Sequence, residues 1–184
     1  MGVCEGPEGK WMKHHVLLTG EIGSGKSTAL KRTLALLDLC AQGLQTYYPQ
    51  ARGEEGRELY LRAWGDTGQG VFLTRLPGCD LAQTARVFDE AGCALLERAK
   101  DADVIVIDEI GRLERDAAHY HAALAACLEG DIPVLAVVRK LKAPWADWIR
   151  SHPNATLIEV TQENREEVPE AAAALIRRGM GHSA

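Results

Sequence analysis

Eight consecutive residues, from Gly20 to Ser27, match the pattern G-x-x-x-x-G-K-[ST] at every fixed position. Glycines let a backbone wrap closely around phosphate oxygens, and the positive end of a following helix attracts the same anion. In this pattern the lysine reaches the β- and γ-phosphates, and the hydroxyl that follows it ligates Mg²⁺. The sequence therefore predicts nucleotide phosphates bound at Gly20, Glu21, Ile22, Gly23, Ser24, Gly25, Lys26, Ser27 and Thr28, with Lys26 also serving catalysis.

Two adjacent acids supply the second half of such a site. Asp108 and Glu109 directly follow the apolar run Val104-Ile105-Val106-Ile107. We expect Asp108 to hold Mg²⁺ through a water, together with Ser27, since Mg²⁺ keeps most of its waters and needs only one or two carboxylates. We expect Glu109 to orient or deprotonate a water near the γ-phosphate, which is a hydrolase arrangement. The plainer interpretations are a solvated strand-end acid for Asp108 and a salt-bridge partner for Glu109.

Further candidates follow later strands. Arg139 and Lys140 come directly after an apolar run, where one of them would approach the γ-phosphate and stabilise charge in the transition state, unless both are solvated. Asn164 and Arg165 follow the last predicted strand, and we expect them to contact the base or ribose of the nucleotide. The alternative for this pair is capping of the final turn.

The elements that position these residues alternate between short buried strands and helices. This pattern predicts an α/β fold in three layers, a mostly parallel sheet covered by helices on both faces, with a small β-hairpin insertion. We expect strands over 14–19, 44–48, 59–62, 71–73, 104–107, 132–138 and 156–160. We expect helices over 26–41, stopped by Gly43, and over 80–100, 114–129, 145–151 and 169–178. Ligands bind at the carboxyl ends of strands in such sheets, where all the candidates lie.

Length and composition limit the number of domains and the class of protein. The 184 residues form one predicted domain, 1–184, with a loose lead-in over 1–12, the strand and hairpin region over 44–76, and a tail over 179–184. The net charge of −5 argues against a nucleic-acid-binding or membrane-surface protein. Five scattered cysteines without a CxxC pair argue against a disulfide framework. Because no signal peptide or membrane-spanning run is visible, we expect a cytoplasmic protein.

Three blocks together resemble a known family. The phosphate loop, the run Asp108-Glu109-Ile110-Gly111-Arg112-Leu113-Glu114 and the run Val160-Thr161-Gln162-Glu163-Asn164-Arg165 are similar to those of the small broad-specificity nucleoside-triphosphatases. The resemblance spans residues 14–176. It implies a P-loop NTPase with a RecA-like sheet that uses Mg²⁺ to hydrolyse nucleoside triphosphates with loose base preference. One departure is that the family's hairpin carries Arg-x-Gly-Phe, where this chain has Arg57-Glu58-Leu59-Tyr60.

Two other functions fit the same loop. A small-molecule or nucleotide kinase has a compatible size, although no arginine-rich lid is visible between residues 110 and 150. A nucleotide-gated regulatory module would hydrolyse slowly and use the hairpin to contact a protein partner, whose identity the sequence leaves open.

Overall fold

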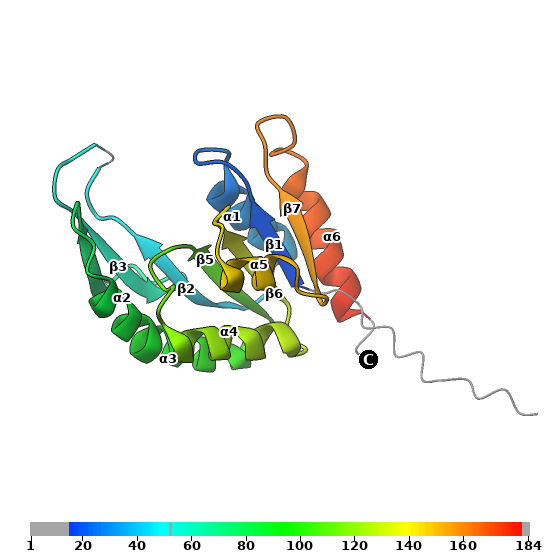
Figure 1. Cartoon of the computed structure of the whole chain (residues 1–184). Helices are drawn as coiled ribbons and strands as arrows, with labels where there is room; N and C mark the ends of the chain where they lie inside the picture. Colours follow the sequence, from blue (N-terminus) through cyan, green and yellow to red (C-terminus); the bar gives the residue numbers. More distant parts are fainter. Residues whose placement is uncertain (1–14, 52, 182–184) are drawn as a thin grey trace, which may run out of the picture.

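Seven strands form one sheet in the computed structural model, which describes residues 15–51 and 53–181 (Figure 1). The predicted lead-in over 1–12 lies outside these residues. The strand order is β4-β3-β2-β5-β6-β1-β7. The strands are β1 His15–Thr19, β2 Ala41–Tyr47, β3 Arg57–Ala63, β4 Val71–Leu76, β5 Val104–Ile110, β6 Val134–Val138 and β7 Ala155–Glu159. The five strands from β2 to β7 in this order are parallel, whereas β3 runs antiparallel to both β2 and β4.

Helices cover both faces of this sheet, which confirms the predicted three layers (Figure 1). Helices α1 Lys26–Leu37 and α6 Val168–Met180 pack together on one face. The opposite face carries α2 Leu81–Val87, α3 Cys93–Arg98, α4 Ala118–Glu129 and α5 Pro144–Arg150. The predicted long helix over 80–100 is present as α2 and α3 joined by a π-helical turn, Phe88–Gly92, and the Asp80 side chain caps its start by accepting from the Gln83 amide.

Alternation along the strands builds two apolar cores. Val16 and Leu18 of β1 face the α1 side, while Leu17 between them faces the α4 side. All three side chains are fully buried. Successive strand residues point to opposite faces, so a strand covered on both sides must be apolar throughout. This requirement explains why the runs at residues 104–107 and 134–138 contain no polar residue.

Several predicted boundaries are wrong. The first helix ends at Leu37 rather than at 41, because Asp38 adopts a left-handed conformation with φ of 52°. The strand predicted from residue 44 begins at Ala41, so Gly43 lies inside β2 and does not stop a helix. A Cβ on Gly43 would meet the Val106 carbonyl oxygen at 1.9 Å, so the close approach of β5 requires glycine there.

Two further differences lie closer to the candidate site. The helix predicted from Glu114 begins at Ala118, and Glu114 lies buried in the preceding loop. The strand predicted as a buried core strand near residues 156–160 is β7, an edge strand in which only Ala155 is buried and the following residues alternate between half-buried and exposed.

The strand order determines what meets at the carboxyl edge of the sheet. Strand β6 lies between β1, which leads into the phosphate loop, and β5, which carries the two acids. The residues that follow β6 are therefore neighbours of both. The ends of β1, β5 and β6 form the floor of one site.

Candidate active site

The phosphate loop connects β1 to α1 through backbone conformations that only glycine adopts readily. Gly20 has φ of 146°, and a Cβ there would meet the Val160 carbonyl oxygen at 2.3 Å. Gly25 has φ of 101° and forms the N-terminal boundary of α1. Positive φ values cost a residue with a side chain about 1 kcal/mol or more. The glycines at fixed positions of the motif are therefore conformational requirements of the loop.

Lys26 begins α1 and folds its side chain back over the loop. Its ammonium donates to the carbonyl oxygens of Gly20 at 3.0 Å and of Glu21 at 2.7 Å. Burial lowers the pKa of Lys26, and the carboxylates of Glu109, Glu21 and Asp108 oppose that effect. A buried cation with incomplete compensation favours an anionic ligand.

Ser27 and Asp108 meet although they are far apart in sequence. The Ser27 hydroxyl, in the first turn of α1, donates to Oδ1 of Asp108 at 3.0 Å. Burial raises the pKa of Asp108, while the hydrogen bond from Ser27 and the charges of Lys31 and Lys26 partly offset the rise. The carboxylate therefore lies where an additional cation would stabilise its charged form.

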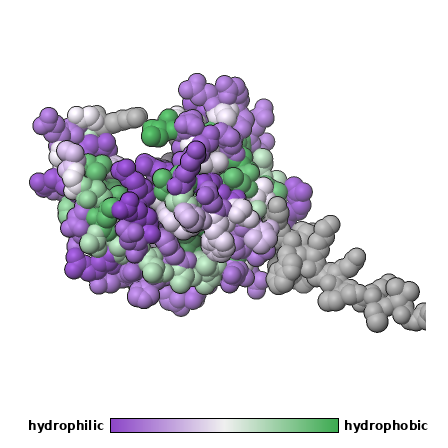
Figure 2. Space-filling view, viewed as in Figure 1, coloured by the Kyte–Doolittle hydropathy of each residue, from purple (hydrophilic) through white to green (hydrophobic). Residues whose placement is uncertain are grey.

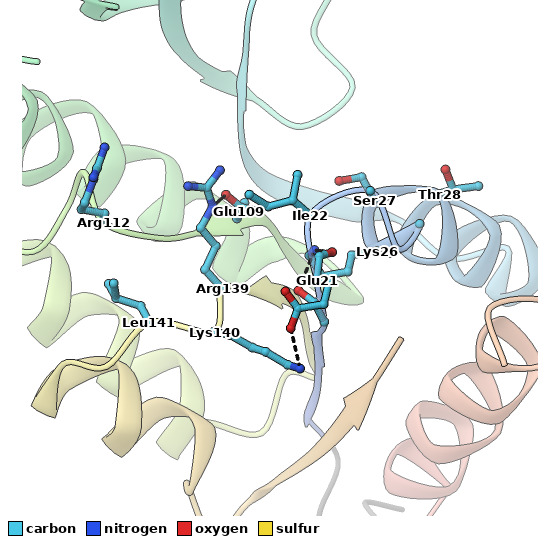
Figure 3. A pocket seen from close by; sticks show the side chains of 13 residues that line it. Glu21, Ile22, Lys26, Ser27, Thr28, Glu109, Arg112, Arg139, Lys140 and Leu141 are labelled. Carbon is cyan, nitrogen blue, oxygen red and sulfur yellow. Dashed lines mark hydrogen bonds and ion pairs between the residues drawn. The ribbon is translucent and has the colours of Figure 1, made fainter. Parts of the chain in front are cut away.

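Glu109, next along β5, is paired with a cation from the neighbouring strand end. Nε of Arg139 donates to Oε1 of Glu109. Burial raises the pKa of Glu109, and the charge and hydrogen bond of Arg139 act in the opposite direction. The two side chains point toward each other in Figure 3.

One cavity of about 630 Å³ is lined by Lys26, Ser27, Glu109 and Arg139, whereas Asp108 lies behind Ser27 and does not line it. This cavity opens at the carboxyl edge of the sheet, and Figure 2 shows a mainly hydrophilic surface that is hollowed along its upper edge. The cavity is large enough for a nucleotide-sized ligand. The residues that line it are Gly20, Glu21, Ile22, Gly23, Gly25, Lys26, Ser27, Thr28, Glu109, Arg112, Arg139, Lys140 and Leu141.

Some predicted site residues lie beside this cavity instead of lining it. Ser24 lines a smaller neighbouring cavity of about 220 Å³, shared with the segment after β7. The Asn164 side chain bonds within the loop after β7. Its Nδ2 donates to the Glu159 carbonyl at 2.8 Å, and its Oδ1 accepts from the Thr161 backbone amide at 2.8 Å. These bonds close the turn after β7 and do not cap α6, whose N-cap residue Glu167 makes no side-chain capping bond. Arg165 lies with its aliphatic stem beside Gly25. Contact of Asn164 or Arg165 with a nucleotide stays a prediction.

The two basic residues after β6 have different partners. Lys140 pairs with Glu21 at 3.0 Å and with Glu159 at 2.5 Å, so it ties the phosphate loop to the end of β7. Arg139 pairs with Glu109 and not with the loop. The sequence placed both residues at the ligand edge but gave no signal that separates them.

Three residues near the acids lie outside the set of predicted site residues. Arg112 and Leu141 line the cavity. Glu114, within the family-like block, is only 2% exposed, and its carboxylate accepts from the Gly111 amide. Its spacing from Gly111 is that of a local turn, which is the signal that would have identified it. Arg57, where the chain departs from the family's hairpin, lies 3.9 Å above the ring of Tyr48 and does not line the main cavity.

The described part of the chain adds two observations on the wider environment. None of its helices has the length and apolar character that crossing a membrane requires. Its four cysteines, Cys40, Cys79, Cys93 and Cys127, are unpaired.

Comparison with known proteins identifies relatives that cover most of the chain. The chain is 28% identical over 167 residues to "Nucleoside-triphosphatase THEP1" of Natranaerobius thermophilus, covering 86% of this chain and 94% of the relative. It is 28% identical over 180 residues to the protein of the same name from Hyperthermus butylicus, covering 94% and 96%. The crystal structure of THEP1 from Aquifex aeolicus matches with a TM-score of 0.69 and 27% identity, covering 89% of this chain and 99% of that one.

A fourth comparison concerns the fold alone. The solution structure of a human cancer-related nucleoside triphosphatase matches with a TM-score of 0.65 at 22% identity, covering 90% of this chain and 98% of that one. The family model described as "NTPase" matches residues 15–173, which include every element from β1 into α6. The chain therefore belongs to the NTPase family, and it is an enzyme of the nucleoside-triphosphatase class.

Proposed function

We propose that the protein hydrolyses nucleoside 5′-triphosphates to the diphosphate and phosphate with the help of Mg²⁺. The observation that carries this proposal is the contact between Ser27 and Asp108 at 3.0 Å, with Glu109 beside them in the wall of the phosphate-loop cavity. A hydroxyl, a metal-binding acid and a second acid are the protein groups that metal-assisted phosphoryl transfer to water requires. Family membership supports the reaction class.

The triphosphate is held by the loop and by Lys26. Backbone amides of the glycine-rich loop and the N-terminus of α1 face the cavity side on which the phosphates would lie. Lys26 now donates to the Gly20 and Glu21 carbonyls, which keeps its ammonium at the loop before any ligand arrives. A preorganised cation loses little conformational entropy on binding.

The residues present fit Mg²⁺ by their chemistry. Asp108 is a mostly buried carboxylate whose pKa is raised by desolvation, so a cation would stabilise its ionised form. Within residues 15–51 and 53–181 no three His, Cys, Asp or Glu side chains cluster as an all-protein metal cage. Mg²⁺ typically uses one or two protein oxygens plus substrate phosphates, so Ser27 and Asp108 would hold it. A Mg²⁺ ion held by these two residues would neutralise charge on the phosphates.

Glu109 acts on the water. The water oxygen attacks the γ-phosphorus, the bond from that phosphorus to the β–γ bridging oxygen breaks, and the water's proton passes to the Glu109 carboxylate. Burial raises the pKa of Glu109, which makes the carboxylate a stronger proton acceptor than an exposed one. The nucleoside diphosphate leaves with the bridging oxygen.

The test is phosphate release from ATP, GTP, CTP and UTP, each with Mg²⁺ and with a chelator. We expect release with all four nucleotides and none after chelation. Glu109→Gln should lower kcat by about 10²–10⁴-fold, the range for a lost general base, with a near-normal KM. Glu90→Gln, an exposed acid on the π-helical turn, is the matched control.

Two outcomes would contradict the proposal. Undiminished turnover in Glu109→Gln removes the role of that residue. Nucleoside diphosphate that forms only after a hydroxyl acceptor is added, with the phosphoryl group on the acceptor and no free phosphate, indicates a kinase instead.

A further inference from the structure

Arg139 is fixed by its backbone at the centre of the site. Its amide donates to the Ile110 carbonyl at 2.9 Å, and its carbonyl accepts from Nη1 of Arg150 at 2.8 Å. It follows the last residue of β6, the strand between the phosphate-loop strand and the acid strand. Only its side chain is free to change position, while its Cα stays beside both groups of the reaction.

The guanidinium of Arg139 holds the carboxylate on which hydrolysis depends. It donates to Oε1 of Glu109, and both side chains line the phosphate-loop cavity and also a second cavity of about 220 Å³ behind it. A carboxylate oxygen engaged by a guanidinium is less available to accept a proton from water. The pair is nonetheless partly open to solvent, with 49% of the Arg139 side chain and 26% of the Glu109 side chain exposed. Exposed ion pairs contribute about 1 kcal/mol or less, so a better anionic partner can displace Glu109.

We propose that Arg139 exchanges partners: it holds Glu109 while the cavity is empty and moves to the γ-phosphate when a nucleoside triphosphate binds. This inference rests on the proposed hydrolysis. A terminal phosphate offers several charged oxygens, which a planar guanidinium binds in bidentate fashion. The exchange releases the Glu109 carboxylate only when substrate is present. It also places a cation where charge develops in the transition state.

The other cations that line the cavity either have partners of their own or lie away from Glu109. Lys26 donates to two loop carbonyls, and Lys140 is held by Glu21 and Glu159. Arg112 has no ion pair within the described residues, but Figure 3 shows it apart from the Arg139 and Glu109 pair. Gly111 leaves room at the pair itself, since a Cβ there would lie 3.3 Å from Cδ of Arg139 and 3.6 Å from Oε1 of Glu109. Arg139 is therefore the cation in direct contact with the Glu109 carboxylate. Arg112 is the alternative candidate for binding the γ-phosphate.

The experiment compares the full chain with Arg139→Ala and Arg139→Lys, and uses Arg115→Ala, an exposed arginine paired with Asp116, as the matched control. We expect Arg139→Ala to lower kcat by about 10²–10³-fold and to raise KM for the triphosphate, while the affinity for ADP, which lacks the γ-phosphate, changes little. We expect the wild type to bind ADP more tightly when Mg²⁺ and aluminium fluoride, which mimics the transferring phosphate, are present. The mutant should lose this difference. Guanidinium ion added to Arg139→Ala should restore part of the turnover, and Arg139→Lys should retain an intermediate kcat.

Three results would overturn the inference. The first is unchanged or raised kcat in Arg139→Ala. The second is an equal loss of affinity for ADP and for the aluminium fluoride complex, which indicates a structural role. The third is a larger loss of kcat in Arg112→Ala than in Arg139→Ala. Failure of the proposed hydrolysis would look different. The wild type would then release no phosphate, or Glu109→Gln would turn over as fast as the wild type.

Discussion

The buried carboxyl of Glu114 gives the fold a specific dependence on pH. The residue is 2% exposed and accepts a hydrogen bond from the Gly111 amide within the loop that follows β5. Burial raises the pKa of Glu114 from 4.5 to about 7, and hydrogen bonds from the backbone reduce the rise. The folded protein therefore binds a proton at this site more tightly than the unfolded chain does.

The sign and size of the effect follow from linkage. Between pH 4.5 and about 7 the unfolded chain has lost the proton of Glu114 while the folded protein retains it. The free energy of unfolding should therefore fall as pH rises through this window. The gap between 4.5 and about 7 corresponds to about 3 kcal/mol, because one pKa unit is about 1.4 kcal/mol.

Glu114→Gln tests this directly. Glutamine keeps an oxygen that accepts from Gly111 and removes the ionisation, so the mutant should lack this component of the pH dependence. Chemical denaturation at about pH 5 and about pH 8 gives the free energy of unfolding for the wild type, for Glu114→Gln and for the exposed control Glu55→Gln. Equal pH slopes in the wild type and Glu114→Gln would refute the reasoning.

Two other substitutions follow from contacts described above. Gly43→Ala should destabilise the fold by about 3 kcal/mol or more, since its Cβ would meet the Val106 carbonyl at 1.9 Å and backbone cannot move aside. The control is Gly68→Ala, whose Cβ would meet only the exposed Asp66 side chain. Thermal unfolding of both variants measures the loss of stability, and equal melting temperatures in the two would contradict the prediction. Ser27→Ala should raise the Mg²⁺ concentration for half-maximal phosphate release about tenfold or more, while ADP binding in chelator stays unchanged. A Mg²⁺ titration identical to that of wild type would exclude Ser27 as a ligand.

The fold was predictable because its main signals are local. The buried runs at residues 104–107 and 134–138 alternate with helical segments, and that is sufficient for a parallel α/β sheet. Predicted boundaries of helices and strands were wrong where tertiary contacts override the local sequence pattern. The glycine at position 43 looked like a helix stop, yet its role is close approach to β5, which depends on a strand sixty residues away.

The site also divides into residues that local motifs predict and contacts that only the tertiary structure determines. Lys26, Ser27 and the acids at 108 and 109 belong to motifs, and the structure brings them to one edge of the sheet. The pairing of Arg139 with Glu109 was not predictable, because it depends on which strand lies between β1 and β5. The bonds of Asn164 within its own loop likewise depend on side-chain geometry that spacing does not fix.

The hairpin formed by β3 and β4 is joined to the catalytic sheet by more than hydrogen bonds. Leu59, Leu61 and Leu73 belong to the same apolar core as Ile105 and Ile107 of the acid-bearing strand. A segment that shares a core is expected to unfold together with it, so the amides of β3 and β5 should exchange with solvent in one cooperative step. Although it lies at the edge of the sheet, the hairpin cannot be removed as a separate module, because its loss would expose the core that supports the two acids.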